Sequence, residues 1–362
     1  MTAMIGEVVR ETTDSIVFKD RGAEVVGGLD DLAISQGDHY TDHYEGYAAE
    51  AQSVADWLSR HEVRVQAADG SEVPLQAFDD AVEACRAVDE EYGATVTPRL
   101  QKITQNPDHH VPQLRPELVY PGYVALQTGG AVVLPTSVGN IVAAASPRGL
   151  STMFAVKERP PSKAGVVLTT MDEIPELAHI PDGWEGYLRH MHSEGILVGS
   201  KLLRNNDHPL FKSQPEWSRD NSQFQDGTSM FVSLPGPYSD VVARMLAKDG
   251  SILTASSANK SGEGNNRNID MLHSDIKRGC DFVAWDPEAV TAYPLDEQHE
   301  SQGIMVDFRP NGDEEGRFHI IRYGFMNGPF ITESVAYIRK HPELAVAQMT
   351  GDLINIADRS NK

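Results

Sequence analysis

Hydrophobic residues follow two different spacings along this chain of 362 residues. Up to about residue 117, and again after residue 328, they recur every three to four positions, as in helices with one buried face. Between residues 118 and 328, short apolar runs alternate with helix-like segments, which is typical of an α/β domain. The pattern predicts an α/β domain over 118–328, with a mainly helical N-terminal extension over 1–117 and a helical tail over 329–362.

The same spacing predicts individual elements. In the extension, apolar residues share one face of a predicted helix from Phe78 to Tyr92, which Gly93 is expected to end. Further helices are predicted over 48–60, 184–193 and 237–248 and from Thr332 to a stop at Pro342, with another helix after it. Strands are predicted over 132–134, 166–169, 196–198, 230–233, 252–255, 282–285, 304–308 and 318–322.

Candidate chemistry gathers between Gly129 and Thr170. We interpret this segment as a buried strand, a tight Pro-Thr turn, a short helix that begins at Ser146-Pro147, and a second strand. Lys157 and Arg159 follow that helix, two residues apart. Two fixed cations beside backbone-rich turns suit an anionic ligand such as a triphosphate, and a solvated pair of surface charges is the alternative.

A second polar segment follows the strand predicted over 252–255. The seven residues from Ser256 to Gly262 offer hydroxyl groups, a side-chain amide and backbone N–H groups to one ligand. Ligands of α/β domains bind at the carboxyl ends of strands, where this segment is expected to lie. An ordinary polar turn explains the same residues when they are taken alone.

Charge and composition restrict the partners. The chain carries 53 acidic and 31 basic side chains, for a formal net charge of −22, which disfavours duplex nucleic acid but not a nucleotide in a local basic pocket. Two distant cysteines, no secretory signal and no apolar run long enough to cross a membrane predict a cytoplasmic protein. His39 and His43 have the spacing of metal ligands on a helix, but no third ligand accompanies them, so no metal ligand is assigned.

Four motifs, in this order along residues 120–325, resemble the YrdC/Sua5 family, the threonylcarbamoyl-AMP synthases and their relatives. The family's motifs are a strand leading to Pro-Thr, then Lys-x-Arg-Pro, then Ser-x-Asn, then a Val-Asp strand followed by Arg-x-Gly. The matching residues are Pro135 and Thr136, then Lys157, Arg159 and Pro160, then Ser257 and Asn259, and finally Val306, Asp307 and Arg322.

The resemblance implies an open, twisted, mixed β-sheet with a concave ligand cavity. It also implies ATP-dependent formation or use of a carbamoyl adenylate from bicarbonate or another carbamoyl donor and an amino acid or other amine, with Mg²⁺, release of pyrophosphate and a place in tRNA modification. In such a site the protein mainly positions reactants and neutralises phosphate charge.

The resemblance also implies roles for individual residues. The predicted catalytic residues are Lys157, Arg159 and Thr136, with Thr136 on the floor near the carbamoyl group. The predicted nucleotide-binding residues are Lys157, Arg159, Ser257, Asn259 and Arg322.

The amino-acid side of these motifs departs from the family. Residues 137–142 replace the family's (Asp/Glu)-Thr-x-Tyr-Gly-Leu, a long polar loop over 203–227 replaces its Trp-Pro-Gly-Pro-Leu-Thr stretch, Ser233 replaces an arginine, and Gly303-Ile304 replaces a Ser-Thr pair. A hydroxyl-bearing substrate such as threonine needs matched polar partners, so we expect altered amino-acid selectivity.

Alternative functions stay open at this point. One is a carbamoyltransferase that handles carbamoyl-AMP. Another is a non-catalytic nucleotide- or RNA-binding module, which Ser233 in place of an arginine favours. A third is a scaffold that forms a homo-oligomer through its terminal helices.

Overall fold

A computed structural model describes most of the chain from residue 76 to residue 344. The described residues are 76–160, 163–212, 221–261, 267–284, 286, 288–289, 292–293, 302–308 and 319–344, together with the backbone of five short strands between residues 8 and 73. The helix predicted over 48–60, the pair His39 and His43, and the last predicted helix lie outside the described residues.

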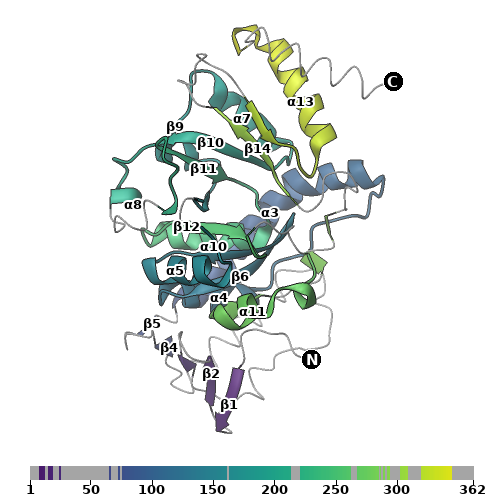
Figure 1. The fold of residues 1–362 in the computed structure, drawn as a ribbon. Helices are drawn as coiled ribbons and strands as arrows, with labels where there is room; N and C mark the ends of the chain where they lie inside the picture. The colour runs from purple at the N-terminus through teal and green to yellow at the C-terminus, as the bar shows by residue number, and fades with distance from the viewer. Residues whose placement is uncertain are drawn as a thin grey trace.

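A ten-stranded mixed sheet forms the centre of the molecule (Figure 1). Its order is β13-β6-β7-β12-β8-β11-β10-β14-β15, with β9 paired to β10. The pairs β13/β6, β8/β11 and β10/β14 are parallel, and the other pairs are antiparallel. The strands are β6 (Ala131–Thr136), β7 (Gly139–Ala144), β8 (Val166–Leu168), β9 (Ala178–His179), β10 (Val198–Arg204), β11 (Thr228–Val232), β12 (Leu253–Ser257), β13 (Phe282–Val283), β14 (Ile304–Asp307) and β15 (His319–Arg322). This architecture confirms the α/β class and the open, twisted, mixed sheet.

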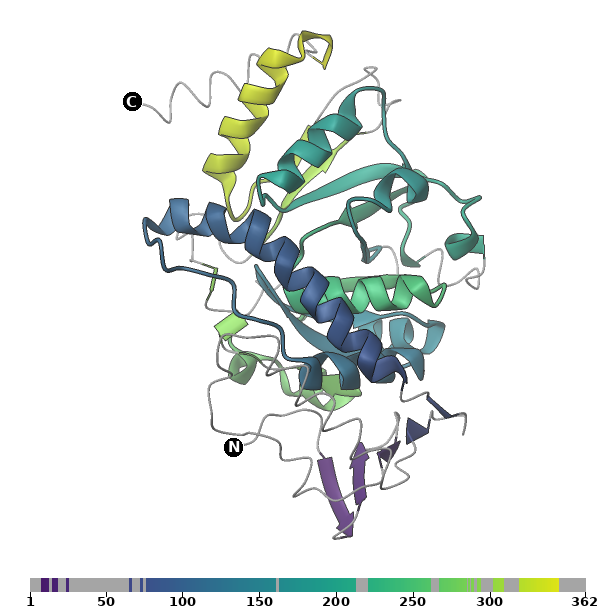
Figure 2. The ribbon, with the colours of Figure 1, turned by 180° about the vertical axis from the view of Figure 1, so that it is seen from behind.

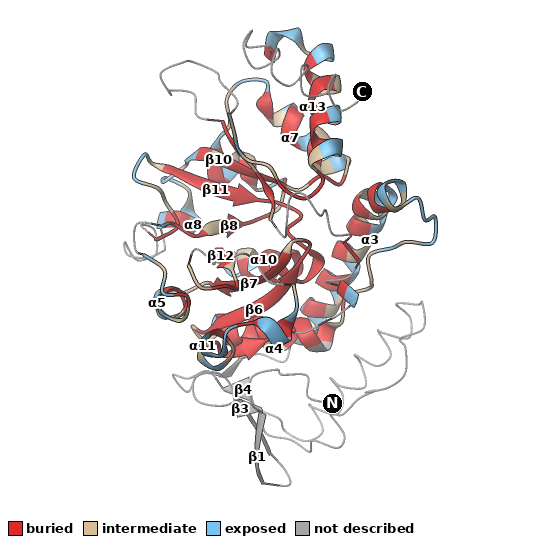
Figure 3. Ribbon diagram, turned by 45° about the vertical axis from the view of Figure 1, so that its right-hand side comes forward, coloured by how far each residue is buried: buried red, intermediate tan, exposed pale blue. Residues whose placement is uncertain are grey.

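Helices pack on both faces of this sheet (Figures 1 and 2). The helices are α3 (Gln76–Thr104), α4 (Pro116–Gln127), α5 (Pro147–Val156), α6 (Ile174–Leu177), α7 (Trp184–Ser193), α8 (Pro209–Lys212), α10 (Pro237–Lys248), α11 (Ser274–Gly279) and α13 (Asn327–Lys340), with 3₁₀ turns at Ile269–Met271 and Pro342–Leu344. Figure 3 shows the buried residues gathered in the strands and on the inward faces of these helices.

The side chains of β6 and β7 alternate between two hydrophobic clusters, one on each face of the sheet. Val132 and Leu134 of β6 join the apolar cluster of α3, α4 and α10, whereas Ala131 and Val133 join the cluster of α5 and α11 on the other face. Successive side chains of a strand point to opposite faces, so both faces of β6 are apolar and buried. A third cluster packs α7 and α13 against β10, β11 and β14.

Local signals predicted several helices correctly. Ser146 caps α5, because its Oγ accepts a hydrogen bond from the N–H of Gly149 at 3.0 Å, and Pro147 occupies the first turn. The helices α7 and α10 have the predicted bounds. The tail helix α13 starts at Asn327, five residues before the predicted start, and ends before Pro342.

The predicted end of the first helix at Gly93 is wrong. α3 runs on to Thr104 and contains Pro98, because its buried stripe continues through Val96 and Leu100. Gly93 lies on the exposed face of α3, where a Cβ would have no atom within 4 Å. The helix therefore continues through this glycine.

The N-terminal extension also differs from the mainly helical segment that was predicted. Residues 8–73 contain an antiparallel sheet of β1 (Val8–Thr12), β2 (Ser15–Phe18), β3 (Glu24–Val25), β4 (Val65–Gln66) and β5 (Glu72–Val73). α3 packs against α4 and α10 in the main core rather than standing apart. The domain boundaries themselves stay a prediction.

No helix among the described residues has the length and apolar character that crossing a membrane requires.

Candidate functional site

The hairpin β6–β7 forms one edge of a cavity. Residues 137 and 138 make the turn, and Thr136 pairs with Gly139 (φ 121°) across it. The predicted turn at Pro135-Thr136 is therefore wrong, since both residues lie in β6 and the chain returns as β7, a strand that the sequence analysis missed. The hydroxyl of buried Thr136 donates to the carbonyl of Gly139 at 2.5 Å and accepts from the N–H of Val138 at 3.3 Å.

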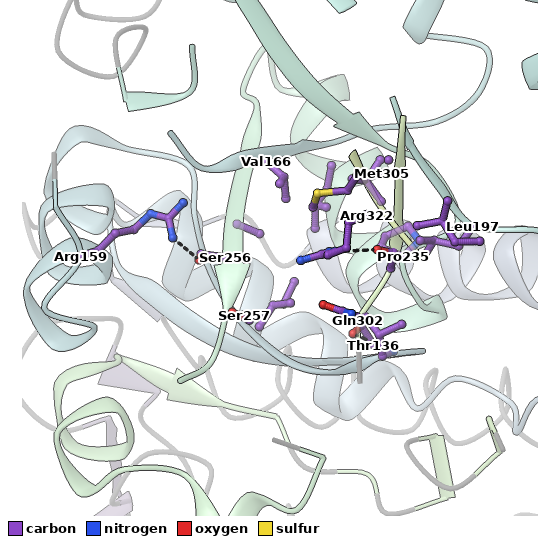
Figure 4. A pocket seen from close by; sticks show the side chains of 18 residues that line it. Thr136, Arg159, Val166, Leu197, Pro235, Ser256, Ser257, Gln302, Met305 and Arg322 are labelled. Carbon is purple, nitrogen blue, oxygen red and sulfur yellow. Dashed lines mark hydrogen bonds between the residues drawn. The ribbon is translucent and has the colours of Figure 1, made fainter. Parts of the chain in front are cut away.

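A cavity of about 300 Å³ lies across one face of the sheet (Figure 4). Its floor follows the register of five strands: Arg322 stands opposite Met305, Met305 beside Gly199, Gly199 opposite Val232, and Val232 beside Leu168. The lining residues are Thr136, Val138, Ile141, Arg159, Val166, Leu168, Leu197, Gly199, Val232, Pro235, Ala255, Ser256, Ser257, Gln302, Gly303, Ile304, Met305 and Arg322.

Arg159 lies at one end of this cavity, beside the end of β12. Its guanidinium donates to Ser256 Oγ at 3.1 Å and to the carbonyls of Lys163 and Ala164 at 2.9 and 2.5 Å. These bonds use three of the five N–H donors and fix the direction of the side chain. Burial lowers the pKa of the guanidinium, which still carries its charge at neutral pH. Ser257, the last residue of β12, lines the cavity next to it.

Lys157 lies behind the cavity wall rather than in it, which differs from the predicted phosphate contact. The side chain is only 1% exposed, and its Nζ donates to the carbonyls of Ser257 and Asn259, the latter at 2.5 Å. The chain turns sharply at Glu158 (φ 51°), between Lys157 and Arg159. The two side chains therefore lie in different places: Lys157 contacts the segment after β12, and Arg159 lines the cavity.

Hydrogen bonds and an ion pair join the Lys-x-Arg-Pro motif to the segment that contains the Ser-x-Asn motif. Besides the bonds of the Lys157 ammonium, the Lys157 carbonyl accepts from the N–H of Ser261 at 3.0 Å, and Lys260 Nζ pairs with Glu158 at 2.7 Å. Asn259 is buried, its amide donates to the carbonyl of Lys260 at 2.8 Å, and it does not line the cavity. Arg159 and Ser257 are thus the members of these two motifs that face the ligand space.

Arg322 lies toward the other end of the cavity. Its Nε donates to the carbonyl of Gly303 at 3.0 Å, and Figure 4 shows the guanidinium extending into the cavity between Met305 and Gln302. Burial lowers its pKa as well. Asp307, from the same motif, pairs with Lys201 at 3.5 Å and does not line the cavity, nor does buried Ser233.

Several lining residues were not predicted. Ser256 belongs to the polar segment 256–262 that was expected at the ligand, but it was assigned no role of its own. The apolar floor and Gln302 carry no local signal, because strand pairing alone brings them to the cavity.

The described residues that line the cavity include no carboxylate. A Mg²⁺ ion held by the phosphate oxygens of a nucleotide would be compatible with this lining. Elsewhere, His190, Glu194 and Glu333 bring ligand atoms within 4.8 Å of one another, but Arg99 already pairs with both carboxylates. We regard this group as an ion-pair cluster between α3, α7 and α13.

Solved structures show what the chain is similar to. A hypothetical protein from Streptococcus mutans UA159 matches with a TM-score of 0.53 and 25% identity, over 59% of this chain and 89% of that one. E. coli YciO matches with a TM-score of 0.41 and 13% identity, over 57% and 89% of the two chains. Sua5 of P. abyssi matches with a TM-score of 0.44 and 14% identity, over 59% of this chain and 58% of Sua5.

No family model and no curated protein sequence matches the chain. The likeness lies in the fold, and the residues of the four motifs come from strands and loops around one sheet. The chain has a fold of the YrdC/Sua5-like family.

Proposed function

We propose that the protein forms or uses a carbamoyl adenylate in an ATP-dependent reaction. The observation that carries this proposal is the position of Arg159 beside Ser256 and Ser257 at the end of β12, in a cavity that also contains Arg322. A guanidinium and hydroxyl groups at a strand end suit phosphate oxygens. The motif order in the sequence supports the same ligand.

The reaction joins an amine, bicarbonate and ATP. The amine nitrogen bonds to the carbon of bicarbonate, and a proton from the amine leaves with the displaced hydroxide as water. A carbamate oxygen then bonds to the α-phosphorus while the bond from that phosphorus to the pyrophosphate oxygen breaks. Arg159 would neutralise phosphate charge, and Arg322 would hold the carbamate or carboxylate end. Mg²⁺ would add positive charge to the phosphates.

Replacing Arg159 by alanine tests the nucleotide site. We expect Arg159→Ala to weaken ATP binding by about tenfold or more, because it removes a charge-assisted contact from a partly buried site. The matched control is Arg189→Ala on α7, whose guanidinium pairs with Asp172 and Glu185 at the surface. Calorimetric titration of both variants with ATP and Mg²⁺ gives the affinities, and equal affinities would show that the phosphates bind elsewhere.

The reaction itself is tested by following pyrophosphate release with ATP, Mg²⁺, bicarbonate and a panel of amines. Release that requires both bicarbonate and an amine supports the synthase reaction. Release that requires carbamoyl phosphate instead would indicate a protein that handles carbamoyl-AMP.

A nucleotide-binding module without catalysis is the second candidate. The burial of Lys157 behind the cavity wall favours it, because Arg159 and Arg322 are then the cations among the described lining residues. ATP binding without pyrophosphate or AMP release for any amine would support this function over the synthase.

A further inference from the structure

We infer that the end of the cavity around Arg322 selects an α-amino acid with an aliphatic side chain over one that carries a hydroxyl group. This inference deepens the proposed function and rests on it for the role of the amine. It concerns the part of the cavity between the β6–β7 turn, the loop before β14, and β15, which we call the Arg322 subsite; its lining residues are Thr136, Val138, Leu197, Pro235, Gln302, Met305 and Arg322.

Arg322 supplies the anion contact of this subsite. The bond from its Nε to the carbonyl of Gly303 fixes the guanidinium, and the terminal N–H groups remain to face the cavity (Figure 4). Two parallel N–H donors of a guanidinium match the two oxygens of a carboxylate. The subsite is thus suited to the carboxylate of an amino acid.

Gln302 supplies a neutral polar contact. Figure 4 shows its side chain entering the same part of the cavity as Arg322, and the described residues include no hydrogen-bond partner for its amide. An amide oxygen accepts from an amine or a carbamate N–H, so Gln302 can serve the amine end of the ligand.

The other polar groups at this end already have partners. The Thr136 hydroxyl donates to the carbonyl of Gly139 and accepts from Val138 N–H. The carbonyl of Pro235 accepts from both the N–H and the hydroxyl of Ser137, at 2.9 and 3.0 Å. The carbonyl of Gly303 is the one that holds Arg322. Each of these groups thus already has at least one hydrogen-bond partner within the protein.

Apolar side chains form most of the remaining wall among the described residues. Val138, Leu197 and Met305 line the subsite, and the floor continues through Gly199 to Val232. A methyl group of the ligand gains by contact with these side chains. A hydroxyl group placed against these apolar side chains loses its water and gains no hydrogen bond from them, which disfavours it.

Valine and threonine provide the decisive comparison, because they have nearly the same shape and differ by a methyl group against a hydroxyl group. In calorimetric titrations of the full chain without nucleotide, we expect L-valine to bind about tenfold more tightly than L-threonine. Isobutylamine, which is valine without its carboxylate, should bind at least about tenfold more weakly than valine, because Arg322 loses its partner.

Two variants localise the effect. Arg322→Gln should weaken valine binding by about tenfold, whereas Arg339→Gln on the exposed face of α13 should leave it unchanged. Met305→Gln, which keeps the length of the side chain and adds an amide, should reduce the preference for valine by offering a partner to the hydroxyl.

A valine preference of at least about threefold in the unaltered chain supports the inference, and the comparison needs no variant to fold. A smaller ratio, a preference for threonine, or no binding of any aliphatic amino acid would overturn it. The proposed function fails by a different result, namely ATP affinity that does not depend on Arg159. The two failures are therefore distinguishable.

Discussion

At the scale of single residues, Lys157 and Arg159 show how two neighbouring cations acquire different tasks. The left-handed backbone at Glu158 turns the chain between them. Arg159 then faces the cavity, whereas Lys157 donates to two backbone carbonyls from the segment that follows β12. Lys157 therefore holds the Ser-x-Asn segment in place and does not line the cavity.

Replacing Lys157 by methionine tests this role. We expect Lys157→Met to lower the free energy of unfolding by about 2 kcal/mol, because two carbonyls lose a charged donor in a buried place. Urea unfolding measures this change, and Lys102→Met at the exposed end of α3 is the control. If Lys157→Met kept full stability but abolished ATP binding, Lys157 would be a phosphate ligand after all.

At the scale of elements, a half-buried ionic network joins α3, α7 and α10. Glu91 of α3 pairs with His192 of α7 at 2.7 Å and with Arg244 of α10, which also pairs with Asp240 at 3.1 Å. Burial alone would raise the pKa of Glu91, but hydrogen bonds from His192 and Arg244 lower it to about 2. Burial raises the pKa of Asp240.

The network predicts an acid-sensitive stability. Because the pKa of Glu91 is about 2 in the folded protein and 4.5 is its ordinary value, its stabilising effect is complete above about pH 5 and is lost as the pH falls toward 2. The full shift would correspond to roughly 3 kcal/mol, and solvent screening of this partly exposed carboxylate makes the contribution smaller. Asp240 acts in the opposite direction, so the net effect in the unaltered chain is smaller.

The variant Glu91→Gln isolates this contribution. Urea unfolding between pH 7 and pH 3 should show a less steep loss of stability in Glu91→Gln than in the unaltered chain. Glu185→Gln, which alters an exposed ion pair on α7, should leave the slope unchanged. Identical slopes for Glu91→Gln and the unaltered chain would contradict the role of Glu91.

At the scale of the whole molecule, α3 belongs to the core that supports the cavity. Its buried side chains pack with α4, α10 and the sheet, and the Tyr92 hydroxyl accepts from the N–H of Gly236 at 3.1 Å. Gly236 (φ 149°) in turn lies against the β6–β7 turn, where a Cβ would come within 2.7 Å of Thr136 Cα. Contacts from the N-terminal part of the chain therefore reach the edge of the cavity.

Removal of α3 should consequently unfold the domain. A chain that begins at residue 105 exposes the core surface that Cys85, Val88, Tyr92, Val96 and Leu100 cover. We expect it to lose cooperative thermal unfolding, which circular dichroism would detect, because the lost apolar burial exceeds a domain's net stability of about 5–15 kcal/mol. A cooperative transition at the melting temperature of the full chain would instead show that α3 is a separate appendage.

The sequence by itself determined the features that depend on near neighbours in the chain. Residues a few positions apart determine the cap of α5 at Ser146 and the bounds of α7 and α10. Each of the four motifs is likewise a short run of neighbouring residues. The sequence does not predict the β6–β7 hairpin, because its turn residues Ser137 and Val138 are not the usual Asn-Gly or Asp-Gly pair and the glycine and alanines of β7 have low strand propensity. Burial between two cores stabilises β7 in its place.

Only the tertiary structure decided which side chains face the ligand. The partners of Lys157 lie a hundred residues away in the chain, and strand pairing brings Arg322 to the same cavity as Arg159. The apolar wall of the Arg322 subsite likewise comes from separate segments of the chain. The role of a side chain depends on which residues from distant parts of the chain pack against it. Residue type and local spacing do not predict those contacts.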